Sequence, residues 1–234
     1  MALKDALISR SPVIDPFAAG DVIGFGVALI RTAAGVCKGA MADNALNLIG
    51  FSVQPANNVA LDKDGFYQAV NNAGTPDIVR VARKGTIINA LVIAKADTSI
   101  IDGDYLEVAP LGDASCYIGV LNESGSNAGE TRIISDCFQA WEDCTMLDES
   151  YQTPDSVSVA VGDSTITFLA ATLAKMGLKV GDYIVLEDLN GDAQLNTVKG
   201  LTATVITLTL PSTVALAATT DYVRKCYQIK GMVL

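Results

Sequence analysis

The stretch TATVITLTL, at residues 202–210, alternates threonine with apolar side chains almost throughout, and Pro211 ends it. A period of two places successive side chains on opposite faces, which is the pattern of a β-strand. Proline ends such a run because it cannot donate a hydrogen bond to the sheet. Similar short runs predict further strands at residues 78–82, 86–94, 105–108, 117–121, 131–135, 183–186 and 221–229. The sequence therefore predicts a mostly β fold.

Tight turns separate these runs. Gly-Asp followed by two apolar residues occurs at residues 20–23, 103–106 and 181–184. In this pattern glycine supplies an unusual backbone angle, and the aspartate can accept hydrogen bonds from amides of the turn. Arg83-Lys84-Gly85 predicts a turn that joins residues 78–82 and 86–94 in a hairpin. Short strands joined by such turns are typical of small barrels.

One segment has the period of a helix. Leu169, Leu173 and Met176 are spaced i, i+4 and i+7, which places them on one helical face. Gly177 follows and suits the C-terminal cap of a helix. The sequence thus predicts one short helix of about two turns.

The chain divides into four expected segments. Residues 1–20 form an extended N-terminal arm, because Ser11-Pro12 and Asp15-Pro16 disfavour a helix. A β domain follows at residues 21–138. Residues 139–156 are acidic and without a period, and they form a linker. Residues 157–234 form a second β unit. We expect two small β-barrel or sandwich-like units, an extended arm and one short helix.

Charge and hydropathy disfavour several classes of partner. The 234 residues carry a net charge of −10, with a pI near 4.4. A surface that follows a phosphate backbone needs clustered Lys and Arg, so direct binding of nucleic acid or of an anionic membrane is disfavoured. No apolar stretch reaches the ~18 residues of a membrane helix. The N-terminus lacks the apolar block of a signal peptide, which indicates an intracellular product.

The residues for common catalytic chemistry are sparse. The chain has no His, which excludes His-dependent triads and imidazole metal sites. Asp62-Lys63-Asp64-Gly65 begins like a calcium loop, but its twelfth position is Ala73. The oxygen-rich loop at residues 187–192 is interpreted as a solvated turn. Five cysteines at irregular spacing are interpreted as buried free thiols: Cys37, Cys116, Cys137, Cys144 and Cys226. We nominate no catalytic residue, cofactor or metal ligand, and expect no enzyme.

Six residues are candidates for contact with another protein. Ile14 and Phe17 are the expected apolar anchors of the arm, whose deletion from Ala2 to Ala19 should weaken assembly but leave the barrels folded. Arg80, Arg83 and Lys84 form the densest basic cluster and could meet an acidic partner. Trp141 is the single tryptophan and is expected to fill a domain seam or an interface.

The sequence resembles structural proteins of tailed-phage virions. Residues 165–211, above all Gly-Leu-Lys-Val-Gly-Asp-Tyr-Ile at 177–184 followed by the strand at 201–210, resemble a β-barrel module of such proteins. The first half is similar to phage head decoration proteins, in which a segment like residues 79–85 precedes a strand. Gly103-Asp104-Tyr105 and Gly119-Val120-Leu121 follow in the same order. Decoration proteins tend to be smaller, so the C-terminal unit would be an addition and leaves a different virion role open.

The resemblance implies a protein of the virion, assembled in the host cytoplasm, that binds and stabilises an assembled capsid shell. Its partners would be the major capsid protein and further copies of itself, often as a trimer. A tail tube, adaptor or fibre-base protein is the second hypothesis, and a tube protein should form rings or filaments by itself. A carbohydrate-binding module and a carboxylate-based enzyme are further alternatives, which a glycan array and a turnover assay would detect.

Overall fold

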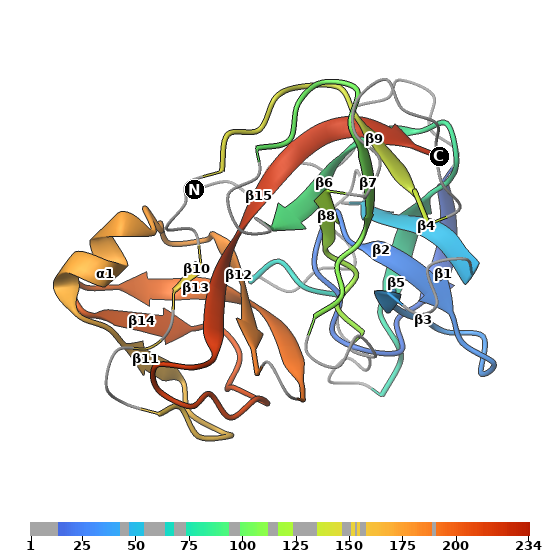
Figure 1. Cartoon of the computed structure of the whole chain (residues 1–234). Helices are drawn as coiled ribbons and strands as arrows, with labels where there is room; N and C mark the ends of the chain where they lie inside the picture. The colour runs from blue at the N-terminus through green and yellow to red at the C-terminus, as the bar shows by residue number, and fades with distance from the viewer. Residues whose placement is uncertain are drawn as a thin grey trace.

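The computed structural model describes residues 14–42, 47–53, 64–67, 74–93, 99–111, 117–123, 135–146, 151–152, 154, 158–188 and 191–234. This part of the chain consists mainly of short strands, with one short helix, α1 (Ala170–Lys175). The predicted mostly β fold of two β units and a short helix is therefore confirmed. Figure 1 shows the two units side by side, joined by one long strand. No helix among the described residues is long and apolar enough to cross a membrane.

The first sheet belongs to the N-terminal part of the chain and is antiparallel throughout. Its strands are β1 (Ile14–Ala18), β2 (Ala28–Arg31), β3 (Cys37–Gly39), β4 (Leu48–Val53) and β5 (Ile78–Ala82), in the order β1-β5-β4-β2-β3. The backbone N–H of Gly20 donates to the Cys37 carbonyl at 2.7 Å, and Ala19 bridges to Cys37. The two outer strands therefore meet at one end, which shortens the free edges of this sheet.

The first unit consists of this sheet and of a second set of strands, which close into a ring with part of the long C-terminal strand. These strands are β6 (Ile87–Ile93), β7 (Tyr105–Val108), β8 (Leu121–Glu123), β9 (Phe138–Ala140) and β15 (Tyr222–Val233). The pairing runs β15-β6-β8-β7-β9 and returns from β9 to β15, so that the five strands form a barrel. Each strand contributes buried apolar side chains to one cluster, and alternate residues of β6 (Ile88, Ala90 and Val92) show the expected period of two.

The second unit is smaller and contains the helix. Its strands are β10 (Tyr151–Gln152), β11 (Thr165–Thr167), β12 (Tyr183–Glu187), β13 (Ala193–Leu201) and β14 (Val205–Leu208). The sheet order is β11-β14-β13-β12-β15, and β10 pairs with β15 as well. Residues 222–225 of β15 pair with β12, whereas residues 226–232 pair with β6. One strand is thus shared by the two units.

The packing also joins the units. One hydrophobic cluster contains Phe25 and Phe66 of the first unit together with Tyr183, Val185 and Leu195 of the second. A separate cluster fills the second unit and includes Leu173 and Met176. The shared strand and the shared cluster fix the units relative to each other.

The predicted helix is present, although only part of its expected face is buried. Leu173 and Met176 are buried, and Gly177 adopts a φ of 56°, which confirms its role after the helix. Leu169 occupies the N-cap and is 61% exposed. A residue at the N-cap has extended backbone, so the helical spacing no longer determines the direction of its side chain.

The predicted hairpin between residues 78–82 and 86–94 is wrong. The turn at Arg83-Lys84-Gly85 exists, since Thr86 N donates to the Arg83 carbonyl at 3.0 Å and Gly85 has a φ of 83°. However, β5 lies between β1 and β4, and β6 lies between β15 and β8. Both edges of each strand are occupied, so the turn carries the chain from one sheet to the other.

Several strand limits differ from the prediction. The strand expected at residues 117–121 begins only at Leu121, and that expected at residues 202–210 is confined to Val205–Leu208. Most of the strand predicted at residues 131–135 lies outside the described residues. The segment predicted as a linker, residues 139–156, includes the end of β9 and all of β10. The boundaries between the four predicted segments stay a prediction.

Candidate functional site

An open groove lies between the two units. Its volume is about 750 Å³. The first unit contributes Asp21, Val22, Ile23, Val27, Gly39, Tyr117 and Ile118, and the second contributes residues from two segments, 161–162 and 192–195, together with Leu210, Pro211, Ser212 and Thr213. Three apolar side chains on its rim remain open to solvent: Val22 is 41% exposed, Tyr117 42% and Val161 66%.

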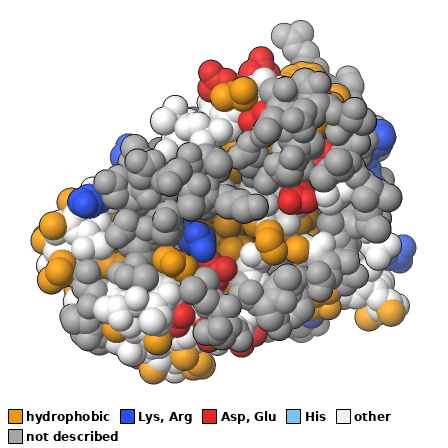
Figure 2. Space-filling view, in the orientation of Figure 1, with side chains coloured by type: hydrophobic (Ala, Val, Ile, Leu, Met, Phe, Trp, Pro, Cys, Tyr) orange, Lys and Arg blue, Asp and Glu red, His pale blue; other side chains and the backbone are white. Residues whose placement is uncertain are grey.

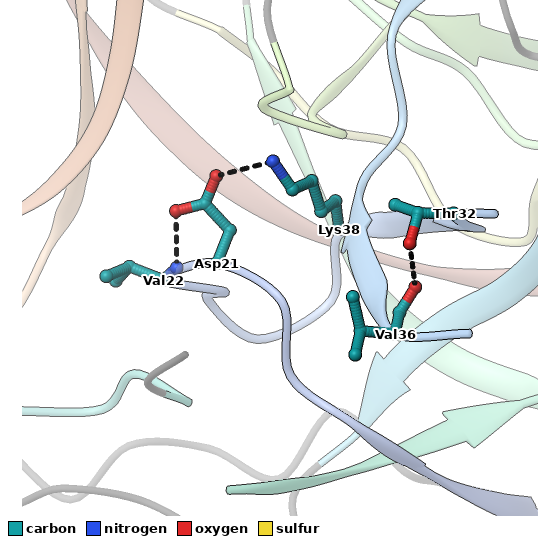
Figure 3. Close-up of polar contacts among 5 residues, drawn as sticks. All are labelled: Asp21, Val22, Thr32, Val36 and Lys38. Atoms are coloured by element: carbon teal, nitrogen blue, oxygen red, sulfur yellow. Dashed lines mark hydrogen bonds and ion pairs between the residues drawn. The ribbon is translucent and has the colours of Figure 1, made fainter. Parts of the chain in front are cut away.

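The first wall of the groove combines an ion-paired carboxylate with an aromatic ring. Figure 3 shows that Lys38 reaches toward Asp21, with 3.9 Å between Nζ and Oδ2. The other carboxylate oxygen of Asp21 accepts a hydrogen bond from the Val22 N–H at 2.8 Å. Lys38 Nζ also lies 4.8 Å from the centre of the Tyr117 ring, within the range of a cation–π contact. Lys38 therefore contacts both Asp21 and Tyr117, and the three side chains form one surface.

The short β2–β3 connection supports this wall. The Thr32 hydroxyl donates to the Val36 carbonyl at 3.2 Å, as Figure 3 shows, and the Thr32 N–H donates to the same carbonyl at 2.9 Å. Gly35 has a φ of 83°, which an L side chain adopts only with strain. These contacts set the position of β3, which carries Lys38.

The second wall is held by hydrogen bonds between β13 and the segment after β14. The Gln194 side-chain amide donates to the Pro211 carbonyl at 3.1 Å and accepts from the Thr213 N–H at 2.9 Å. The Gly162 N–H donates to the Ser212 carbonyl at 2.7 Å and holds the turn that carries Val161. Both walls are thus built from ordered backbone.

Tyr183 fixes the distance between the walls. Its hydroxyl donates to the Gly65 carbonyl at 2.7 Å and accepts from the Phe25 N–H at 3.3 Å. A Cβ on Gly24 would lie 2.7 Å from Leu195 Cδ2 and 3.0 Å from Tyr183 Cε1, so the two units approach each other closely at this glycine. The groove is therefore preorganised.

The predicted anchor of the arm lies within the protein's own sheet. Phe17 is half-buried, and its strand pairs with β5 in a register that places it opposite Val79. Ile14 pairs with Ala82, but its side chain lies outside the described residues, as do residues 1–13. Ala19 is buried. Deletion of residues 2–19 would remove strand β1 from the first sheet, and the expectation that the barrels fold without it stays a prediction.

The structure brings two of the predicted contact residues together. The guanidinium carbons of Arg83 and Arg31 lie 5.3 Å and 5.7 Å from the centre of the Phe17 ring. Arg83 also donates to the Ile49 carbonyl at 2.7 Å, and Lys84 is exposed in the adjacent turn. Arg80 is exposed in β5 next to Val79, which is buried, so its side chain leaves the opposite face of the sheet.

Trp141 follows β9 and is 40% exposed, so a large part of its indole faces solvent. The backbone N–H of Trp141 donates to the Lys230 carbonyl at 2.9 Å. The adjacent turn carries Ile101, which is 51% exposed, and Gly103 N donates to the Ala140 carbonyl at 3.0 Å. Sequence reasoning missed Ile101 and the groove residue Tyr117. The Gly103-Asp104 turn signal could have placed Ile101 at the surface, whereas no local signal marks Tyr117.

The described thiols are poorly suited to reaction. Burial raises the pKa of the Cys37 thiol to about 11, against the opposing effect of Arg31 and Arg83. Burial also raises the pKa of Cys144 and of Cys226, with Glu142 and Asp182 adding to the respective shifts. Cys137 is buried, and Cys116 lies outside the described residues. Within the described part of the chain, no group of three or more His, Cys, Asp or Glu side chains could hold a metal ion.

Two sequence comparisons gave no relative. A scan against models of known protein families finds no match, and a search of curated protein sequences likewise finds none.

Proposed function

We propose that this protein is a structural component of a virion that binds an assembled capsid shell and stabilises it, with the major capsid protein as its partner. Residues 165–211 and the segments near residues 79–121 support the proposal through their resemblance to phage virion proteins. The structural observation that carries it is the preorganised groove between the units. An open groove with exposed apolar side chains on its rim is typical of a surface that receives another protein.

The chemistry of the groove favours an extended, largely apolar segment of a shell protein. Among the residues that the structure describes, its lining includes the carboxylates of Asp21 and Asp192 and neither Lys nor Arg. Asp21 is already paired with Lys38. A phosphate backbone would find no basic side chain in this described lining, and the adjacent Lys38 is already paired with Asp21, whereas an uncharged segment would bury Val22, Tyr117 and Val161. Tyrosine is enriched among the residues that contribute most to binding energy in protein interfaces.

Two valines provide a matched test of the groove. Val161 and Val180 occupy equivalent turns, because Asp163 Oδ2 accepts from Ala160 N and Asp182 Oδ2 accepts from Lys179 N, each at 2.8 Å. Both side chains are more than half exposed, at 66% and 51%. Val161 lines the groove and Val180 does not. Replacing each by Asp makes the same chemical change at an exposed position of the same kind of turn.

The experiment is density-gradient sedimentation of tagged protein with intact heads from a lysate of the native source. We expect the wild type and Val180→Asp to migrate with the major shell protein, and Val161→Asp to lose about tenfold or more in affinity. Equal binding of the two variants would exclude the groove. Recovery of the wild type only among small soluble species would overturn the virion proposal. Migration with tails would instead favour the tail or adaptor role.

A further inference from the structure

An acidic face surrounds the exposed tryptophan. We define the acidic face as Ile101, Asp102, Trp141, Glu142 and Asp143, all of which are exposed. The Asp102 N–H donates to Asp143 Oδ1 at 2.9 Å, and the Lys230 N–H donates to Glu142 Oε1 at 2.8 Å. These bonds hold two carboxylates beside the indole before any partner arrives. The face therefore offers an apolar centre with a fixed negative rim.

A basic face surrounds the half-buried phenylalanine. We define the basic face as Phe17, Arg31, Arg83 and Lys84. Arg31 and Lys84 are exposed, and Arg83 is half-buried. Both guanidinium groups lie within 6 Å of the centre of the Phe17 ring, which holds them at the surface. Lys84 follows Arg83 in the chain, so this face carries three of the 16 basic residues of a chain whose net charge is −10.

Both faces border the C-terminal part of β15. Trp141 N donates to the Lys230 carbonyl at 2.9 Å, and Gly85 N, next to Lys84, donates to the Val233 carbonyl at 2.7 Å. Residues 230 and 233 are separated by about 10 Å along a strand. Figure 2 shows acidic side chains among hydrophobic ones along the upper edge of the first unit, and basic side chains at its right edge. The backbone contacts of Trp141 and Gly85 therefore place both faces beside the C-terminal part of β15, at different residues.

We propose that this end of the first unit is a contact between two copies of the chain. In a two-fold arrangement, the acidic face of one copy meets the basic face of the other, and the same contact repeats across the axis. Three carboxylates then oppose three cations, and each aromatic side chain meets an oppositely charged rim. Complementary charges close to an apolar centre set the partner and the register of such a contact. The contact is independent of the proposed binding to a shell.

The test uses the purified full chain and no particle. Sedimentation velocity at about 0.1 M salt leaves facing charges effective, because the screening length is then about 10 Å, while it weakens the general repulsion between two acidic molecules. The variants are Lys84→Glu, Asp102→Lys and Trp141→Ala. Lys199→Glu is the matched control for Lys84→Glu, because Lys199 is exposed on β13, outside both faces, and gives the same net charge.

We expect the wild type and Lys199→Glu to associate as dimers, and each of the other three variants to raise the dissociation constant about tenfold or more. Raising the salt to about 0.5 M should dissociate the wild type as well. A monomeric wild type at about 200 µM, far above micromolar dissociation constants, would overturn the proposal. Equal association of Lys84→Glu and Lys199→Glu, with both folded by circular dichroism, would also overturn it.

Discussion

Replacing Gly231 by alanine is expected to disrupt the barrel where β15 meets β9. Gly231 pairs with Ala140, and a Cβ at this position would lie 2.1 Å from the Gln139 carbonyl oxygen and 2.4 Å from Phe138 Cε1. The oxygen belongs to the backbone of the neighbouring strand, so no change of side-chain rotamer relieves the clash. Overpacking a core costs typically 1–3 kcal/mol and occasionally more, and two contacts this short place the expected loss at about 3 kcal/mol or above.

Gly200 provides the control for this substitution. It also lies within a strand, but the nearest atoms to an added Cβ belong to the Thr207 side chain at 3.4 Å. Alanine there should leave the free energy of unfolding unchanged or raise it by up to about 1 kcal/mol, because it restricts the unfolded chain.

Urea unfolding can follow both variants through the fluorescence of Trp141, the single tryptophan, together with circular dichroism. Trp141 is a suitable probe because its backbone N–H donates to the carbonyl of Lys230, the neighbour of Gly231. A loss of about 3 kcal/mol corresponds to a Tm lower by roughly 6–12 °C in a chain of this size. If the two variants unfolded within about 0.5 kcal/mol of each other, the closure of the barrel between β9 and β15 would be refuted.

Two further predictions concern the buried polar groups. Glu187 accepts from Arg224 Nε at 2.5 Å, with side-chain exposures of 5% and 16%, so Glu187→Ala should cost about 3 kcal/mol by leaving a guanidinium without this partner. A thermal melt checks this, and a Tm within about 1 °C of the wild type would contradict it. Burial raises the pKa of Cys37 to about 11, above the ~8.5 of an unfolded chain. The unfolded state therefore loses this proton first, and stability should fall above pH ~8.5 by on the order of 1 kcal/mol per unit until the folded thiol also ionises. The difference between the urea midpoints at pH 8 and pH 10 should be smaller in Cys37→Ala than in the wild type. An equal difference in the two proteins would contradict the raised pKa of Cys37.

Local patterns predicted the class of the fold and much of its turn chemistry. The Gly-Asp signal is an example, because Gly103 and Gly181 adopt φ values of 96° and 92°. Asp104 and Asp182 each accept from an amide three residues earlier at 2.8 Å, as the sequence predicted. Gly20 shares the pattern but not the positive φ, and Asp21 bonds the next residue, Val22. A turn of this kind depends on neighbouring residues alone, so the local sequence is largely enough to predict it.

Local sequence patterns could not predict which strands pair with one another. The turn at residues 83–85 has the same signature whether the chain folds back or crosses to another sheet, and the choice depends on β15, which lies about 140 residues later in the chain. The groove depends on the same long-range contacts. Val22, Tyr117 and Val161 meet only because the shared strand and Tyr183 bring two distant parts of the chain together. No spacing along the sequence could have grouped them.

The shared strand also links the stability of the fold to the proposed function. Separating the walls of the groove requires breaking the Tyr183 bonds to Gly65 and Phe25, and also exposing the hydrophobic cluster that crosses the units. β15 cannot tilt toward either unit without losing its pairing with β12 or with β6. The groove therefore keeps its width in the unbound protein, and a bound segment need not supply the free energy for closing it. Binding would then depend on the rim side chains, which is why Val161→Asp and Val180→Asp should differ so clearly in their affinity for the shell.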